Sequence, residues 1–287
     1  MIRAAAAAVA ALLALAAVRP AASAEVVTLP GPGGVALRAV LVLPPEPRRR
    51  GVPVVALHGC AGLGGPGGPP RLPRREADWA VRLAALGHPV LFPDSFGSRG
   101  VAEVCRGPEG AIRPESLRRE DAHAAAAWAA AQPWAAGPAA GAFVLGWSHG
   151  GSTALAAAHA PVPPGLIRAA VAFYPGCRRP GQPVPSWSPA VPVLMLLGEA
   201  DEWTPPAPCR ALAAGAAGEG RVTVVSYPGA HHGFDQPDLP VRELAGLAMA
   251  PREGGRARMG TDPAVRADAL VRVPAFLGLH GGSAAQN

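Results

Sequence analysis

The chain has 287 residues and a formal net charge of +6, from 26 basic and 20 acidic side chains. All the basic side chains are arginine, and they are scattered along the chain in single positions and short runs such as those at 48–50 and 74–75. Because no basic stripe is interleaved with aromatic residues, we expect no nucleic-acid partner. The 263 residues that follow residue 24 (287 − 24) suffice for one large α/β domain with a substantial core.

The first 24 residues have the organisation of a secretory signal peptide. The basic residue Arg3 precedes an apolar Ala/Leu/Val stretch, and a small-residue ASA sequence ends at Ala24. The apolar stretch is short for a membrane-spanning helix, which needs roughly 20 residues, although an uncleaved anchor is the alternative. We therefore expect a signal peptide at 1–24, no membrane anchor after its cleavage, and a secreted or periplasmic protein.

After the leader, short apolar runs alternate with alanine-rich stretches of helical character. Strands are predicted at 35–43, 52–59, 89–94, 142–148, 169–175, 191–201 and 221–229. Helices are predicted at 76–86, 116–132, 149–160, 205–215 and 262–278. The later strands are nearly continuous apolar runs, as is typical of parallel strands that are buried on both faces. The pattern predicts an α/β protein with a doubly wound, mostly parallel sheet flanked by helices.

The domain is expected to span 25–280, with a disordered tail at 281–287. Two irregular stretches, 62–73 and 235–261, are expected to run over the active face. In such a sheet, functional groups gather at the carboxyl ends of the strands.

One strand end carries a G-x-S-x-G pattern, Gly146-Trp147-Ser148-His149-Gly150. An apolar strand runs directly into Ser148, and an alanine-rich helix follows at once. The glycines allow a sharp strand-to-helix turn that presents the serine hydroxyl above the sheet. In a glycine-rich chain the pattern alone is weak, and a structural turn is the alternative. The strand–turn–helix context is what predicts that Ser148 is a nucleophile.

A nucleophilic serine needs a general base and an acid that orients the base. Asp201 ends the predicted strand 191–201, and the rival carboxylates Glu199 and Glu202 are expected to face solvent. Two adjacent histidines follow the next strand in GAHHGF, residues 229–234. Serine, then acid, then histidine is the chain order of the α/β-hydrolase fold.

Together these stretches resemble the dienelactone hydrolase family of α/β hydrolases, including its exported members that carry a serine nucleophile. The resemblance rests on LHGCAGL, FPDSFGSRG, GWSHGG, FYPGC, GEADEWTP and YPGAHHGF, which are spread over nearly the whole chain after the leader. The family pattern G-A-x-H-G-F implies that His232 is the triad histidine and leaves His231 at the variable position. The pattern G-x-x-D-x-x-x-P likewise implies that Asp201 is the acid.

The resemblance also implies two backbone donors for the oxyanion of a tetrahedral intermediate. One is the N–H of His149, directly after the nucleophile, and the other is the N–H of Cys60 in the loop HGCAG. The best-known relatives have a cysteine nucleophile where Ser148 stands, and a glutamate that engages the resting thiol where Gly59 stands. We therefore expect a serine mechanism without thiol-specific activation, and the substrate need not be a dienelactone.

Four residues are further candidates for substrate contacts. Trp147, Trp203 and Phe234 flank the three proposed catalytic residues, where they either line an acyl pocket or pack in the core. Arg99 either binds a substrate carboxylate or forms a structural salt bridge, with Asp94 as the suggested partner.

Four cysteines at positions 60, 105, 177 and 209 show no spacing typical of a zinc site. In an oxidising compartment an even number suggests disulfides, and buried free thiols are the alternative. Because the members of each pair follow neighbouring predicted strands, we choose Cys177–Cys209 and Cys60–Cys105 among the three possible connectivities.

No metal site or cofactor is expected. Adjacent side chains on an extended segment point opposite ways, so His231 and His232 rarely reach the same ion. The chain also lacks the glycine-rich loops of nucleotide-binding proteins.

The sequence therefore predicts a serine hydrolase that cleaves small carboxylic esters or lactones through an acyl-enzyme. One alternative is a prolyl-oligopeptidase-like peptidase, which usually carries an added gating domain. The other is a non-catalytic secreted binding protein of the same fold, which would not need an intact triad and oxyanion loop.

Overall fold

The computed structural model describes residues 23–45, 51–65, 67–107, 110–136, 141–178, 183–218 and 220–281. The predicted signal peptide lies outside these residues except for Ser23 and Ala24, which begin the first strand. The predicted tail also lies outside them, apart from Gly281 at the end of the last helix. None of the described helices has the length and apolar character needed to cross a membrane.

Eight strands form one sheet in the order β1-β2-β4-β3-β5-β6-β7-β8. The strands are β1 (Ser23–Pro30), β2 (Ala36–Leu43), β3 (Val54–Leu57), β4 (Val90–Pro93), β5 (Ala142–Trp147), β6 (Ile167–Phe173), β7 (Val193–Gly198) and β8 (Val222–Tyr227). β2 pairs antiparallel with β1 and β4, and all other neighbours are parallel. The mostly parallel sheet is confirmed.

All seven predicted strands are present in this sheet, and β1 is its one strand that was not predicted. β1 is an edge strand whose side chains are mostly exposed, so it lacks the apolar run that marks the other strands. It also crosses the predicted cleavage site, so cleavage after Ala24 would remove its first two residues.

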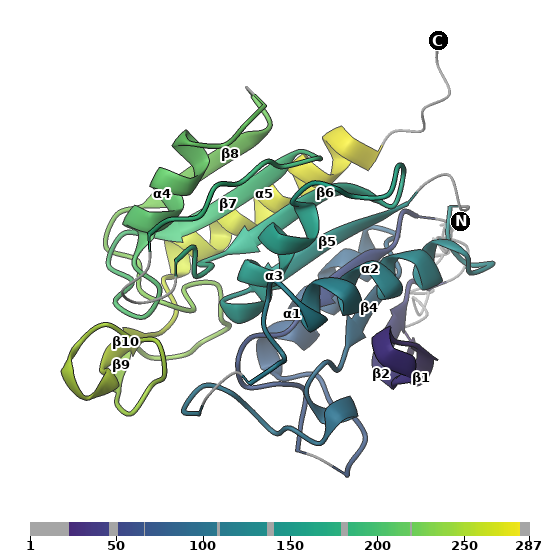
Figure 1. Ribbon diagram of the computed structural model, residues 1–287, viewed down its shortest axis with the longest axis horizontal. Coiled ribbons are helices and arrows are strands. Elements are labelled where there is room, and N and C mark those ends of the chain that lie inside the picture. Colours follow the sequence, from purple (N-terminus) through teal and green to yellow (C-terminus); the bar gives the residue numbers. More distant parts are fainter. Residues whose placement is uncertain are drawn as a thin grey trace, which may run out of the picture.

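Helices cover both faces of the sheet. They are α1 (Arg74–Ala85), α2 (Leu117–Ala130), α3 (His149–Ala158), α4 (Pro206–Ala214) and α5 (Pro263–Gly281). Figure 1 shows α2 and α3 in front of the sheet and α5 behind it. β3 illustrates the two cores: Val54 and Ala56 pack on the side of α1 and α5, while Val55 and Leu57 pack on the side of α2 and α3. This alternation follows from the two-residue period of a strand.

The predicted excursion at 235–261 contains a small hairpin, β9 (Arg242–Leu244) and β10 (Ala257–Met259), which stands apart from the main sheet (Figure 1). The N–H of Gly260 donates to the carbonyl oxygen of His232 at 3.0 Å. The excursion therefore returns beside the loop that carries the histidine pair.

Candidate active site

Ser148 lies in a sharp turn between β5 and α3. Its φ of +55° is in the left-handed region that residues other than glycine rarely adopt. The flanking glycines permit the turn through close approach, because a Cβ on Gly146 would collide with the carbonyl oxygen of Gly150, and one on Gly150 with that of Leu57. The serine is 7% exposed and lines a cavity of about 650 Å³.

Asp201 and His232 form a buried hydrogen-bonded pair. The Nδ1–H of His232 donates to Asp201 Oδ2 at 2.7 Å. The N–H groups of Trp203 and Thr204 both donate to Asp201 Oδ1 at 2.9 Å, which fixes the carboxylate. Because Nδ1 carries the proton in this arrangement, Nε2 of a neutral His232 is the nitrogen left to accept one.

The sequence analysis did not single out Thr204, whose hydroxyl joins both members of this pair. Its Oγ1 lies 2.9 Å from Asp201 Oδ2 and 3.1 Å from His232 Nδ1. Its position three residues after the acid was the available signal, because short loops of this kind fold back on an aspartate. The imidazole of His232 also packs against two aromatic rings, with centroids 4.6 Å away for Tyr174 and 4.8 Å away for Trp203.

Four adjacent strands bring these residues to one edge of the sheet. Ser148, Tyr174, Asp201 and His232 follow β5, β6, β7 and β8 respectively. Ser148 and His232 both belong to the described part of the chain, and Ser148 Oγ makes no hydrogen bond with His232 there. The neighbouring His231 is engaged elsewhere, with its Nδ1 2.9 Å from the carbonyl oxygen of Ala200.

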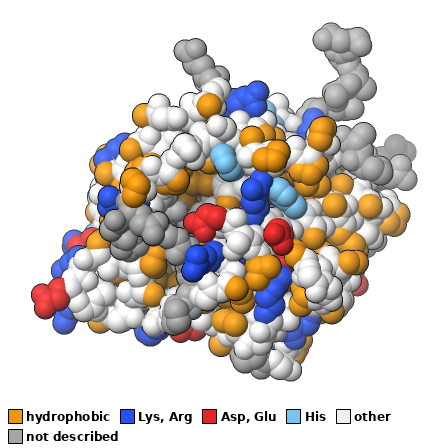
Figure 2. Space-filling model, in the orientation of Figure 1, with side chains coloured by type: hydrophobic (Ala, Val, Ile, Leu, Met, Phe, Trp, Pro, Cys, Tyr) orange, Lys and Arg blue, Asp and Glu red, His pale blue; other side chains and the backbone are white. Residues whose placement is uncertain are grey.

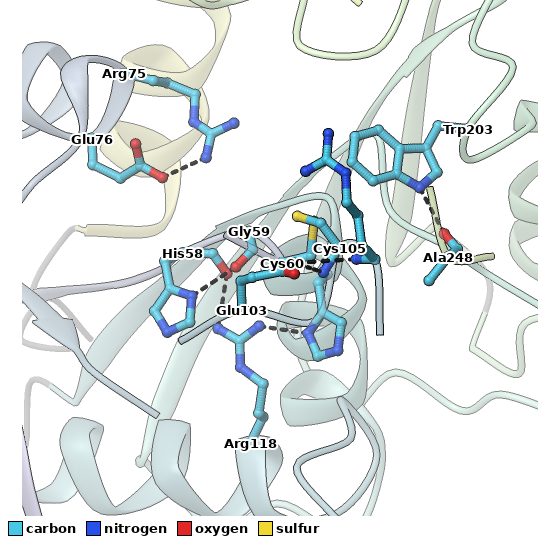
Figure 3. The surroundings of a disulfide bond; sticks show 12 residues. His58, Gly59, Cys60, Arg75, Glu76, Glu103, Cys105, Arg118, Trp203 and Ala248 are labelled. Atoms are coloured by element: carbon cyan, nitrogen blue, oxygen red, sulfur yellow. Dashed lines mark hydrogen bonds and ion pairs between the residues drawn. A yellow bond between two sulfur atoms is a disulfide. The ribbon is translucent and has the colours of Figure 1, made fainter. Parts of the chain in front are cut away.

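A buried arginine joins the two segments that carry the expected oxyanion donors. Arg118 of α2 is fully buried, and its Nη2 donates to the His58 carbonyl oxygen at 2.9 Å (Figure 3). Its Nη1 donates to Nδ1 of His149 at 2.6 Å, and its guanidinium lies over the ring of Phe96 at 5.0 Å. The sequence analysis missed this residue. The available signal was its spacing, because Arg118 precedes Ala122 by four residues and so shares the buried face of α2.

His58 is fully buried beneath the same loop. Its Nδ1 donates to the Gly59 carbonyl oxygen at 2.7 Å. Burial, reinforced by the nearby charge of Arg118, lowers the pKa of His58 well below its ordinary value. The neutral imidazole is therefore the stable form at this position.

Both predicted disulfides are present. Cys177–Cys209 joins the loop after β6 to α4, and Cys60–Cys105 joins the loop after β3 to the loop after β4. β6 and β7 are neighbours in the sheet, and so are β3 and β4, as the choice of connectivity assumed.

The Cys60–Cys105 disulfide belongs to a longer chain of contacts (Figure 3). The carbonyl oxygen of Cys105 accepts a hydrogen bond from the N–H of Ala248 at 2.7 Å. The Ala248 carbonyl oxygen in turn accepts from Nε1 of Trp203 at 3.0 Å. The loop that carries Cys60 is thereby connected to the loop that carries the acid.

The suggested substrate contacts need correction. Of the three aromatic residues only Trp203 lines the cavity. Trp147 and Phe234 are fully buried in the core, and Nε1 of Trp147 donates to Asp235 Oδ2 at 2.8 Å. Trp147 points away from the cavity because side chains alternate along β5, which places Phe143, Leu145 and Trp147 together in the core on the side of α1 and α5.

Arg99 has a structural role, but its partner differs from the suggestion. Its guanidinium binds both carboxylate oxygens of Asp121 at 2.7 and 2.8 Å. Asp94 pairs instead with Arg38 at 3.1 Å. The two-point ion pair occupies Arg99, which is not among the described residues that line the cavity.

The described part of the chain contains no group of three or more His, Cys, Asp or Glu side chains placed to hold a metal ion. The described residues of the 62–73 stretch do not line the cavity, whereas Ala248, Met249 and Pro251 of the 235–261 stretch do. Figure 2 shows the face that carries α2, α3 and α4, with arginine, acidic and histidine side chains near its centre among hydrophobic ones.

Comparison with known proteins decides the family. The model of the dienelactone hydrolase family matches residues 37–279. The chain belongs to the dienelactone hydrolase family. It is accordingly a hydrolase with an α/β-hydrolase fold, and membership implies a small-molecule substrate.

Solved structures agree on the fold of this dienelactone hydrolase family member. A dienelactone hydrolase-like promiscuous phosphotriesterase from metagenomic libraries has a TM-score of 0.65 and 20% identity, with 92% of this chain and 100% of that chain covered. A candidate dienelactone hydrolase from Klebsiella pneumoniae has a TM-score of 0.61 and 21% identity, with 90% and 99% covered. A puromycin-hydrolysing peptidase from Mycobacterium tuberculosis has a TM-score of 0.61 and 20% identity, with 91% and 40% covered. A search of curated proteins gave no match.

Proposed function

We propose that this family member is a serine hydrolase that cleaves small carboxylic esters or lactones, with Ser148, Asp201 and His232 as its triad. The buried Asp201–His232 hydrogen bond, at the sheet edge where Ser148 sits in its sharp turn, carries the proposal. This pair leaves Nε2 of His232 as an acceptor, which is what a serine nucleophile requires.

In the proposed reaction, Ser148 Oγ attacks the ester carbonyl carbon while His232 Nε2 takes the hydroxyl proton. The backbone N–H groups of Cys60 and His149 would donate to the developing oxyanion. His232 then returns the proton to the leaving alcohol, which gives an acyl-enzyme, and activates a water for its hydrolysis. A hydrogen bond between Ser148 and His232 would form when substrate binds, because catalytic hydrogen bonds often tighten only in the complex.

We also propose that residues 1–24 are a cleaved signal peptide and that residues 25–280 form the catalytic domain. The two disulfides support a secreted or periplasmic location, because disulfides persist in oxidising compartments. Mass spectrometry of protein purified from the periplasm tests this, and a chain that still begins at Met1 would contradict it.

The function is tested by assaying residues 25–287 with p-nitrophenyl acetate, a simple lactone and a peptide p-nitroanilide. We expect turnover of the ester or lactone and a loss of about 10⁴-fold or more in Ser148→Ala. Ser188→Ala, a half-buried serine outside the proposed centre, is the matched control and should keep full activity. Ester turnover that survives in Ser148→Ala, or turnover of the amide alone, would overturn the proposal.

A further inference from the structure

The cavity beside Ser148 extends well past the proposed triad. It follows one face of α3, where the lining residues His149, Ser152 and Ala156 recur at helical spacing, and it reaches His159 directly after the helix. A helix rises about 1.5 Å per residue, so the face from His149 to Ala156 is roughly 10 Å long. The cavity is therefore a groove that begins at Ser148 and runs along α3, and we call it the α3–α4 groove.

The second wall of this groove comes from the start of α4. Pro205, Pro208 and Leu212 also line it, and they too recur at helical spacing. The Cys177–Cys209 disulfide fixes α4 to the loop after β6, and Cys177 is itself a lining residue. The groove is thus bounded by fixed elements.

Part of the wall between α3 and α4 is apolar, although Arg119, Arg178 and His159 also line the cavity. Leu155, Trp187 and Leu212 line it, and each is at most 6% exposed. The indole Nε1 of Trp187 donates to the carbonyl oxygen of Leu155 at 3.1 Å, so the ring is anchored to α3. An anchored apolar wall favours an apolar ligand group, because each buried methylene is stabilised by about 0.8 kcal/mol.

The size of the groove exceeds the needs of a small ester. Cavities of about 300–1,000 Å³ hold drug-sized ligands, and this one measures about 650 Å³. An acetyl ester or a simple lactone would occupy only the end next to Ser148. The rest of the groove would stay without a ligand group.

We infer that the α3–α4 groove binds the acyl chain of a medium-chain ester, with octanoyl as the test case. The inference rests on the proposed function. The leaving alcohol must face His232 to receive its proton, and His232 is not among the described lining residues of the groove. The acyl chain is then the part of the substrate that extends along α3.

The test is a series of p-nitrophenyl esters from acetate through butyrate and hexanoate to octanoate. We expect kcat/KM to rise about two- to fourfold per methylene, as burial of an alkyl chain predicts. A flat or falling series with active enzyme would overturn the inference and leave the proposed function standing. A stronger dependence on alcohol length, measured with butyl and octyl acetate, would also overturn it.

A substitution in the groove makes the test specific. Ala156→Phe places a ring on the lining face of α3, so we expect octanoate kcat/KM to fall at least tenfold while acetate stays within about threefold. Ala127→Phe, on the exposed side of α2, is the matched control and should change neither value. Equal losses for acetate and octanoate in Ala156→Phe, with Tm unchanged, would overturn the inference.

A binding measurement keeps the inference testable if no ester is hydrolysed. Octanoic acid is titrated calorimetrically into residues 25–287 and into Ala156→Phe. Binding to the wild type that weakens at least tenfold in Ala156→Phe supports the groove even if the hydrolase proposal fails. No binding to the wild type, together with no turnover, overturns both.

Discussion

The acid–histidine side of the proposed site and its proposed oxyanion side are held together in different ways. Asp201 is fixed by groups two and three residues further along, in Trp203 and Thr204. On the oxyanion side, Arg118 lies 60 residues from the His58 carbonyl that it binds, and Cys105 lies 45 residues from Cys60. The carboxylate of the acid is fixed within its own loop, whereas the oxyanion side is held by contacts between distant parts of the chain.

The difference suggests that activity responds differently to substitutions on the two sides. In the proposed mechanism, changes on the acid–histidine side remove a chemical group that acts in the reaction, whereas changes on the oxyanion side displace backbone donors that remain present. We therefore expect large losses on the first side and graded losses on the second.

The largest expected effect comes from His232→Ala. Loss of the base should lower kcat by about 10⁴-fold or more, about as much as Ser148→Ala, and the double variant should be little worse than either single variant. His231→Ala is the matched control and should stay within about tenfold, because that side chain contacts the Ala200 carbonyl. Steady-state kinetics with p-nitrophenyl acetate decide it. An inactive His231→Ala with an active His232→Ala would show that the loop is assigned one residue out of register.

The second prediction concerns substitutions of Arg118 on the oxyanion side. Arg118→Met should lower kcat by about 10- to 100-fold with KM within about threefold, because both contacts that align the donors are lost. Arg118→Lys keeps the charge and should recover part of kcat. Thermal unfolding identifies a temperature at which each variant is folded. A change in KM alone, or equal kcat values for the two variants, would exclude a positioning role.

The sequence predicted the locally built side well. Asp201 and His232 stand in short motifs directly after apolar runs, so their place at the sheet edge followed from strand order and the resemblance. The same reasoning applied to the cysteine pairs, which follow neighbouring strands. The internal strands were equally clear, because strands buried on both faces are apolar throughout.

The arginine contacts beside the oxyanion side were not predicted from the sequence. Arg118 looks like a solvated residue in an alanine-rich helix, and only the packing of α2 on the sheet brings it to His58. Arg99 was expected near Asp94, yet Asp121 of α2 supplies the better two-point partner. For Trp147 an acyl pocket and the core were both possible, and side-chain alternation along β5 places it in the core.

The third prediction compares the two disulfides. Cys105→Ser and Cys209→Ser open loops of similar length, with separations of 45 and 32 residues, so each should lower the free energy of unfolding by about 4 kcal/mol. Only Cys105→Ser frees the loop of an oxyanion donor, so at a temperature where both variants are folded it should lower kcat for p-nitrophenyl acetate by about tenfold. Equal kcat values would contradict a specific role of Cys60–Cys105 in alignment.

The smallest expected effect concerns stability and pH. The pKa of folded His58 lies below its unfolded value near 6.5, because of burial and then the charges of Arg118, His149 and Arg75. Its stabilising contribution is therefore complete above about pH 6.5 and is lost as the pH falls towards the folded pKa, by at most about 1.4 kcal/mol per pH unit.

Urea unfolding between about pH 5.5 and 8 measures this slope, and His58→Gln should reduce it. Part of the slope should remain, because burial also lowers the pKa values of His88 and His123. An identical slope in His58→Gln would mean that the pKa of His58 does not differ between the folded and unfolded states.

The most direct test of the central claim is covalent labelling of residues 25–287 with a fluorophosphonate, followed by peptide mapping. The account predicts one adduct, on the Ser148 hydroxyl, and its loss in Ser148→Ala and His232→Ala but not in His231→Ala. An adduct on another residue, or labelling that persists in Ser148→Ala, would contradict the account.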